Sequence, residues 1–129
     1  MGLMQRRGES VLVIDDSESI LEIERLALEQ GGFTVYTAIA PKEGIEIYRQ
    51  NSGKIQLVFL DYNMPEMNGD EVFRCLKEIR PDVKVCLVTS REDNEVFQLL
   101  REGVRCYIRK PFRLEEIIHC AQMAGAIAE

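Results

Sequence analysis

The chain has 129 residues, of which 46% are hydrophobic and 29% are charged, and its formal net charge at pH 7 is -6. This length favours one globular domain with a real core, and the acidic balance argues against nucleic-acid binding. No stretch is long and apolar enough to span a bilayer, and the polar start lacks the apolar core of a secretory signal, which favours a cytoplasmic location.

The first half of the chain alternates short apolar runs with segments of helical pattern. Residues 11–15 form an apolar run that ends in an acid, which is typical of a strand covered on both faces. Ser17 then provides an N-cap for a helix that Gly31 ends. Residues 33–38 predict a second strand, and residues 41–50 predict a second helix with a proline in its first turn.

The second half continues the same alternation. Its predicted strands span residues 57–60, 83–88 and 105–108, and its predicted helices span residues 70–79, 93–102 and 112–128. Five strand–helix units in a row predict an α/β fold, a single doubly wound (βα)5 domain of flavodoxin-like strand order. We expect a five-stranded parallel sheet with helices on both faces, in a domain of residues 10–129 that follows an N-terminal extension of residues 1–9.

Polar side chains follow the predicted strands where each strand ends. Asp15 and Asp16 follow the first strand and Asp61 follows the third, while Thr89 and Lys110 follow the fourth and fifth. Ligand sites in such sheets lie beyond the carboxyl ends of the strands, at the switch in strand order. These side chains are therefore expected to converge in one cleft.

Three carboxylates in one cleft need compensating positive charge. A like-charged pair roughly 4 Å apart costs about 4 kcal/mol at an effective dielectric constant near 20. A divalent cation together with Lys110 would balance Asp15, Asp16 and Asp61, and oxygen ligands favour Mg²⁺, with Mn²⁺ as the alternative, over zinc. Asp61, at the centre, could then act as a nucleophile that accepts a phosphoryl group.

Four segments, VLVIDDSESI, FLDYNMPEMNG, VTS and YIRKPF, together resemble the receiver domains of two-component response regulators. The match runs from about residue 11 to residue 128, and the segments occur in the family's order. The resemblance implies that Asp61 is the phosphoacceptor. It also implies that Asp16 ligates Mg²⁺ directly, that Asp15 acts largely through water, and that Asn63 offers its main-chain carbonyl to the metal.

The same resemblance implies a switch and its partners. Lys110 would pair with the phosphoryl group, after a cis bond to Pro111, while Thr89 would be the switch hydroxyl and Tyr107 the switch aromatic. A histidine kinase or phosphotransfer protein is the expected donor. A downstream protein or attached domain would bind the face formed by the fourth helix, fifth strand and fifth helix. The domain would catalyse its own phosphorylation and slow dephosphorylation, and it would not be a metabolic enzyme.

Other readings of these residues stay open. Asp61 could be a turn residue, Asp15 and Asp16 could favour a helix N-terminus, Thr89 could be a helix cap, and Tyr107 could be a packing residue. At the level of function, the alternatives are an aspartate-nucleophile phosphatase, whose Asp-x-Asp spacing is broken here, and a docking domain that works without phosphate. The chain could be a stand-alone regulator or part of a larger protein, such as a hybrid histidine kinase.

For three further groups of residues, the sequence favours a structural role over a role in the chemistry of the site. The single histidine, His119, is expected at the surface or in packing on the last helix. The arginines near the expected switching face form either a solvated basic rim or a docking patch, and they are Arg101, Arg105, Arg109 and Arg113. The cysteines are expected to be buried free thiols, with a disulfide or zinc role as the less favoured alternative, and they are Cys75, Cys86, Cys106 and Cys120.

Overall fold

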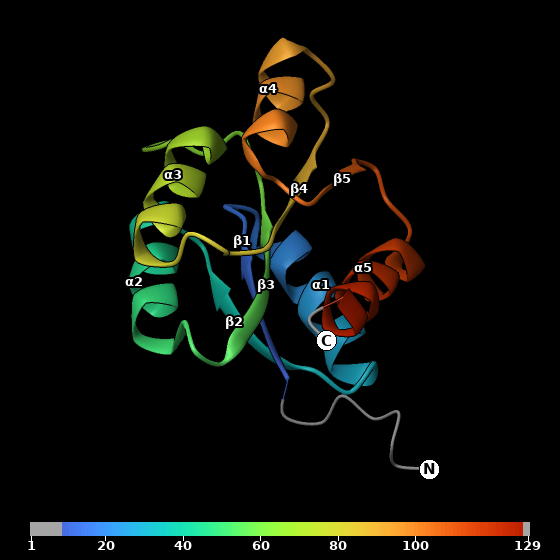
Figure 1. Ribbon diagram of the computed structural model, residues 1–129. Coiled ribbons are helices and arrows are strands. Elements are labelled where there is room, and N and C mark those ends of the chain that lie inside the picture. The colour runs from blue at the N-terminus through green and yellow to red at the C-terminus, as the bar shows by residue number, and fades with distance from the viewer. Residues whose placement is uncertain (1–8, 128–129) are drawn as a thin grey trace.

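The computed structural model describes residues 9–127, with side chains described from residue 9 to residue 124. Strands and helices alternate strictly along the chain (Figure 1). The strands are β1 (Ser10–Ile14), β2 (Thr34–Ala38), β3 (Ile55–Leu60), β4 (Val85–Thr89) and β5 (Cys106–Arg109). The helices are α1 (Glu18–Gln30), α2 (Pro41–Asn51), α3 (Gly69–Ile79), α4 (Asn94–Glu102) and α5 (Leu114–Ile127). The predicted extension at residues 1–9 lies outside the described residues except for Glu9.

All five strands are parallel, and their order in the sheet is β2-β1-β3-β4-β5. This order confirms the predicted flavodoxin-like topology, in which the chain moves to one side of β1 and then returns to build the other side. The switch in direction therefore lies between β1 and β3. No helix among residues 9–127 combines the length and apolar character that crossing a bilayer requires.

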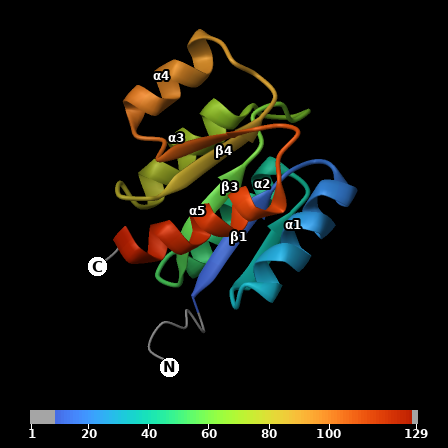
Figure 2. The same cartoon turned by 90° about the vertical axis from the view of Figure 1, so that its right-hand side faces the viewer.

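Helices cover both faces of the sheet, with α1 and α5 on one side and α2 and α3 on the other (Figures 1 and 2). The buried side chains form two clusters that the sheet separates, and α4 packs in the same cluster as α2 and α3. Alternate strand residues point to opposite faces, so β1 sends Leu12 and Ile14 to one cluster and Val11 and Val13 to the other. This two-sided burial explains the continuous apolar runs in the sequence.

Candidate functional site

The sheet register brings the acids of β1 and β3 together. Ile14 is the ladder partner of Leu60, and the main-chain N–H of Asp61 donates to the Ile14 carbonyl at 3.0 Å. Asp15 is tied to the other neighbouring strand, because its N–H donates to the Ala38 carbonyl at 3.1 Å. Both acids are therefore held by backbone hydrogen bonds at the same edge of the sheet.

The carboxylates of Asp15, Asp16 and Asp61 form one cluster. Each offers an oxygen atom that lies within 4.8 Å of the others. Asp15 and Asp61 are 2% and 6% exposed, whereas Asp16 is open to solvent. Three convergent carboxylate oxygens with one open side match the oxygen ligands and retained waters that Mg²⁺ requires. The donor set thus fits the expected cation.

Lys110 places its ammonium group between the two buried acids. Its Nζ lies 3.1 Å from Asp15 Oδ2 and 3.6 Å from Asp61 Oδ1. The main-chain N–H of Lys110 donates to the Thr89 carbonyl at 3.0 Å, and the peptide bond to Pro111 is cis, as the resemblance predicted. The lysine supplies one positive charge to a site with three carboxylates, so the protein alone leaves an excess of negative charge.

Burial and the neighbouring charges both affect the ionisation of Asp61. Burial and then the charge of Asp15 raise the pKa of Asp61 to about 6, against an opposing contribution from Lys110. Burial disfavours the charged form of Lys110, but Asp15 and Asp61 outweigh it and the pKa of the lysine is raised. Asp61 is therefore a carboxylate that a cation would stabilise in its ionised, nucleophilic form.

The two predicted switch residues, Thr89 and Tyr107, both form hydrogen bonds with the main chain of Arg91. Thr89 is fully buried, and its Oγ1 accepts a hydrogen bond from the main-chain N–H of Arg91 at 3.2 Å. The hydroxyl of Tyr107 donates to the main-chain carbonyl of Arg91 at 2.5 Å. Arg91 thus connects the hydroxyl and the aromatic ring through its own peptide groups.

The Arg91 side chain spans the two loops that border the site. Its guanidinium lies 4.6 Å from the centre of the Tyr62 ring and bonds to Asn63 Oδ1 at 3.4 Å. It also pairs with Asp93 and Glu95 on the α4 side. This link between the two loops emerges only from the folded chain.

A close backbone contact holds the loop after Asp61. The N–H of Gly69 donates to the Tyr62 carbonyl at 2.7 Å, and a Cβ at position 69 would lie 2.8 Å from the Tyr62 Cα. Only glycine allows this approach without displacing the backbone. The Asn68-Gly69 pair therefore lets the first turn of α3 close against the residue next to Asp61.

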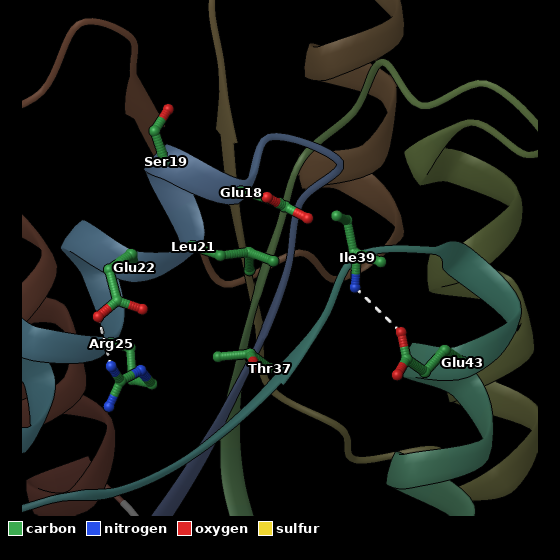
Figure 3. A pocket seen from close by; sticks show the side chains of 8 residues that line it. All are labelled: Glu18, Ser19, Leu21, Glu22, Arg25, Thr37, Ile39 and Glu43. Carbon is green, nitrogen blue, oxygen red and sulfur yellow. Dashed lines mark hydrogen bonds and ion pairs between the residues drawn. The ribbon is translucent and has the colours of Figure 1, made fainter.

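A surface pocket of about 640 Å³ has no lining residue from the acid cluster. Figure 3 shows its lining side chains, which come from α1, β2, the loop after β2 and the start of α2. Two of its acids already have partners, since Glu22 pairs with Arg25 and Glu43 accepts a hydrogen bond from the Ile39 N–H at 3.1 Å. The clustered acids Asp15, Asp16 and Asp61 do not line this pocket.

Glu24, in the middle of α1, is a feature that sequence reasoning missed. It is 1% exposed, and neither of its carboxylate oxygens has a hydrogen-bond partner within residues 9–127. Burial, followed by the nearby charge of Asp15, raises the pKa of Glu24 to about 8. The apolar residues Ile23 and Leu26 on the same helix are 44% and 48% exposed, so the apolar pattern did not identify the buried face.

The structure also shows the surroundings of the other residues singled out in the sequence, which are Asn63, Asp15, His119 and the four arginines of the expected face. Asn63 follows Asp61 in an exposed part of the loop, and a hydrogen bond from its main chain lowers the pKa of Asp61. Asp15 also serves the local role considered for it, because its Oδ1 accepts from the Ser17 N–H at 2.9 Å. His119 is exposed on α5, and the four arginines of the expected face are exposed as well.

Comparison with known proteins agrees with this geometry. Residues 11–122 match the family model described as response regulator receiver domain. A crystal structure of a response regulator receiver domain protein from Clostridium thermocellum is 30% identical and superimposes with a TM-score of 0.84, covering 94% of this chain and 99% of that one. The BeF3-activated receiver domain of DrrB is 28% identical with a TM-score of 0.78, covering 92% and 97% of the two chains.

The relatives with assigned names include a sensor kinase and a response regulator, the two kinds of protein that make up a two-component system. The sensor kinase CckA of Brucella abortus (strain 2308) is 30% identical over 109 residues, and the response regulator SaeR of Staphylococcus aureus (strain USA300) is 28% identical over 109 residues. Each alignment covers 84% of this chain, but only 12% of the kinase and 46% of the regulator. The chain therefore belongs to the family of response regulator receiver domains, which are signalling modules of two-component systems.

Proposed function

We propose that this receiver domain takes a phosphoryl group from a phosphohistidine onto Asp61 and passes the signal on through a protein-binding face. One observation supports this most directly. The buried carboxylate of Asp61 lies within 4.8 Å of two further acids and 3.6 Å from the ammonium of Lys110. Phosphoryl transfer depends mainly on positioning and charge neutralisation, and this arrangement supplies both.

In the proposed reaction, a P–O bond forms to a carboxylate oxygen of Asp61 while the P–N bond of the donor histidine breaks. The leaving imidazole takes the bonding electron pair. Lys110 pairs with an oxygen of the transferred group, and the Thr89 hydroxyl donates to another. Mg²⁺ held by Asp15, Asp16, Asp61 and the Asn63 carbonyl would neutralise charge on the phosphoryl oxygens.

The proposed switch starts at Thr89. Donating to the phosphoryl group would turn its hydroxyl toward Asp61 and away from the N–H of Arg91 that it now accepts from. The same Arg91 peptide segment accepts from Tyr107, so the ring would lose its present anchor. A local change of charge would thus shift the surface of α4, β5 and α5 between two states.

We further propose that the donor protein covers an apolar groove beside the site. This groove, about 570 Å³, lies between α1 and the loop after β5, and its lining includes Ile23, Lys110, Phe112 and Leu114. A donor histidine must reach bonding distance of Asp61, so its protein has to bury the surface around Lys110. Exposed Ile23 and Leu114, 44% and 42% accessible, provide apolar contacts for that protein.

Intact-mass analysis after incubation with Mg²⁺ and acetyl phosphate tests the central step. The parent protein should gain one phosphoryl group and Asp61→Asn should gain none. Asp82→Asn, an exposed acid outside the cluster, should behave as the parent. A phosphoryl group retained by Asp61→Asn at the parental level would remove Asp61 from its role.

The same preparations distinguish the two rival functions. Multiple turnover of a small phosphomonoester such as p-nitrophenyl phosphate would favour a phosphatase. Failure of the folded parent to bind Mg²⁺ or to react with acetyl phosphate would favour a docking domain that works without phosphate. The complete set of three acids, Thr89 and Lys110 argues against the second alternative.

A further inference from the structure

Three of the four cysteines meet between the sheet and α5. Cys86 on β4 and Cys106 on β5 are ladder partners, and Cys120 reaches them from α5. The Sγ atoms of Cys106 and Cys120 are 3.4 Å apart, and all three Sγ atoms lie within 4.8 Å of one another. Three soft ligands from three different elements therefore converge on one point.

The surroundings of these thiols are apolar on one side and open on the other. Cys86 is fully buried within the cluster of core side chains under α1 and α5, whereas Cys106 and Cys120 are half-buried at its margin. An ion from solution can reach the two half-buried sulfurs, and the buried sulfur closes the site from below. A dry shell around thiolates favours retention of a bound soft ion.

We propose that Cys86, Cys106 and Cys120 form a binding site for one thiophilic d¹⁰ metal ion, with Cu(I) as the ion that a set of three thiolates suits best. Thiolates select Cu(I) and zinc among the biological metals. Zinc in structural sites takes four protein ligands, and no fourth His, Cys, Asp or Glu joins these three within the described side chains. Cu(I) is satisfied by three.

The geometry requires little movement. With metal–sulfur bonds of about 2.3 Å, three sulfurs in a plane around one ion lie about 4 Å apart. The cluster already meets this spacing within its 4.8 Å limit, and the Cys106–Cys120 pair must open only slightly from 3.4 Å. A disulfide would instead require that pair to close to about 2.05 Å, would need an oxidant such as hydrogen peroxide, and would leave Cys86 unexplained.

The three thiols share their protons unequally. Hydrogen bonding with Cys106 and then with Cys86 lowers the pKa of Cys120, whereas hydrogen bonding with Cys120 raises the pKa of Cys106 and burial raises the pKa of Cys86. The thiols lose their protons as the ion binds, because metal ligation requires the deprotonated form. Binding should therefore strengthen as the pH rises.

Competition against a chromophoric Cu(I) chelator, under anaerobic reducing conditions, tests the proposal on the full chain. We expect one copper ion per chain, in an environment that X-ray absorption shows to be all sulfur. Cys120→Ser and Cys106→Ser should weaken binding by about 100-fold or more, since even indirect supporting groups cost 10–100-fold. Cys75→Ser, on α3 and outside the cluster, is the matched control and should bind as the parent.

Cys86→Ala is a secondary variant, because a substitution at a buried position could unfold the protein. The result for Cys120→Ser, at a half-buried position, therefore decides the test. The proposal does not rest on phosphorylation, so Asp61→Asn should bind copper as the parent does. Absence of copper uptake by the folded parent would overturn it. Equal copper affinity in Cys120→Ser and Cys75→Ser would overturn it as well.

Discussion

Replacing Glu24 should stabilise the protein. Its pKa rises from 4.5 to about 8 in the folded chain, mainly because the carboxylate is buried and also because Asp15 lies nearby. Between these two values the folded state holds more protons than the unfolded state, so the free energy of unfolding falls as pH rises. The loss is about 1.4 kcal/mol per pH unit, or about 3 kcal/mol at pH 7.

Urea unfolding of the metal-free protein at several pH values between 5 and 7.5 measures this effect. Glu24→Leu should exceed the parent by about 3 kcal/mol at pH 7, and the difference should shrink as the pH is lowered toward 5. Glu24→Gln should flatten the same pH dependence. Glu22→Gln, an exposed position on the same helix, should keep the parental slope. A parental slope in Glu24→Gln would refute the reasoning, because Glu24 would then be ionised in the folded state.

Two further substitutions test the frame of the site. Gly69→Ala forces a Cβ against the Tyr62 backbone and should lower the free energy of unfolding by about 1–3 kcal/mol. Gly53→Ala, where nothing lies within 4 Å, should change it by less than about 0.5 kcal/mol, and equal effects of the two would contradict the close contact. Lys110→Met leaves Asp15 and Asp61 without their ammonium group and should lower stability by on the order of 2 kcal/mol. Mg²⁺ should raise the melting temperature of Lys110→Met more than that of the parent, and an equal or smaller rise would show that the lysine does not balance the acids.

The order and type of every secondary-structure element could be predicted from the sequence. The central strands β1, β3 and β4 are buried on both faces and leave continuous apolar runs, and capping residues and glycines mark the helix ends. The convergence of Asp15, Asp61 and Lys110 followed from the same prediction, since the ends of parallel strands share one edge of the sheet. Their roles in chemistry remain predictions, although the structure brings them together.

Other features depended on packing that no sequence pattern records. The burial of Glu24 depends on how α1 is rotated against the sheet, and exposed Ile23 and Leu26 on that helix obscured the buried face. The meeting of Cys86 with Cys120 depends on where α5 crosses the strands. Positions 34 residues apart in the chain carry no spacing signal for such a contact.

The backbone hydrogen bonds that hold the strand ends have a consequence for how such a module can diversify. Asp15, Asp61 and Lys110 are each secured by their N–H to a carbonyl of a neighbouring strand, so their placement does not depend on the outer surfaces of the helices. Solvent-facing residues of the helices can therefore be exchanged while the placement of these three side chains is kept. Paralogous signalling routes could diverge from one ancestor in this way, each keeping the same chemistry while losing cross-talk with its siblings.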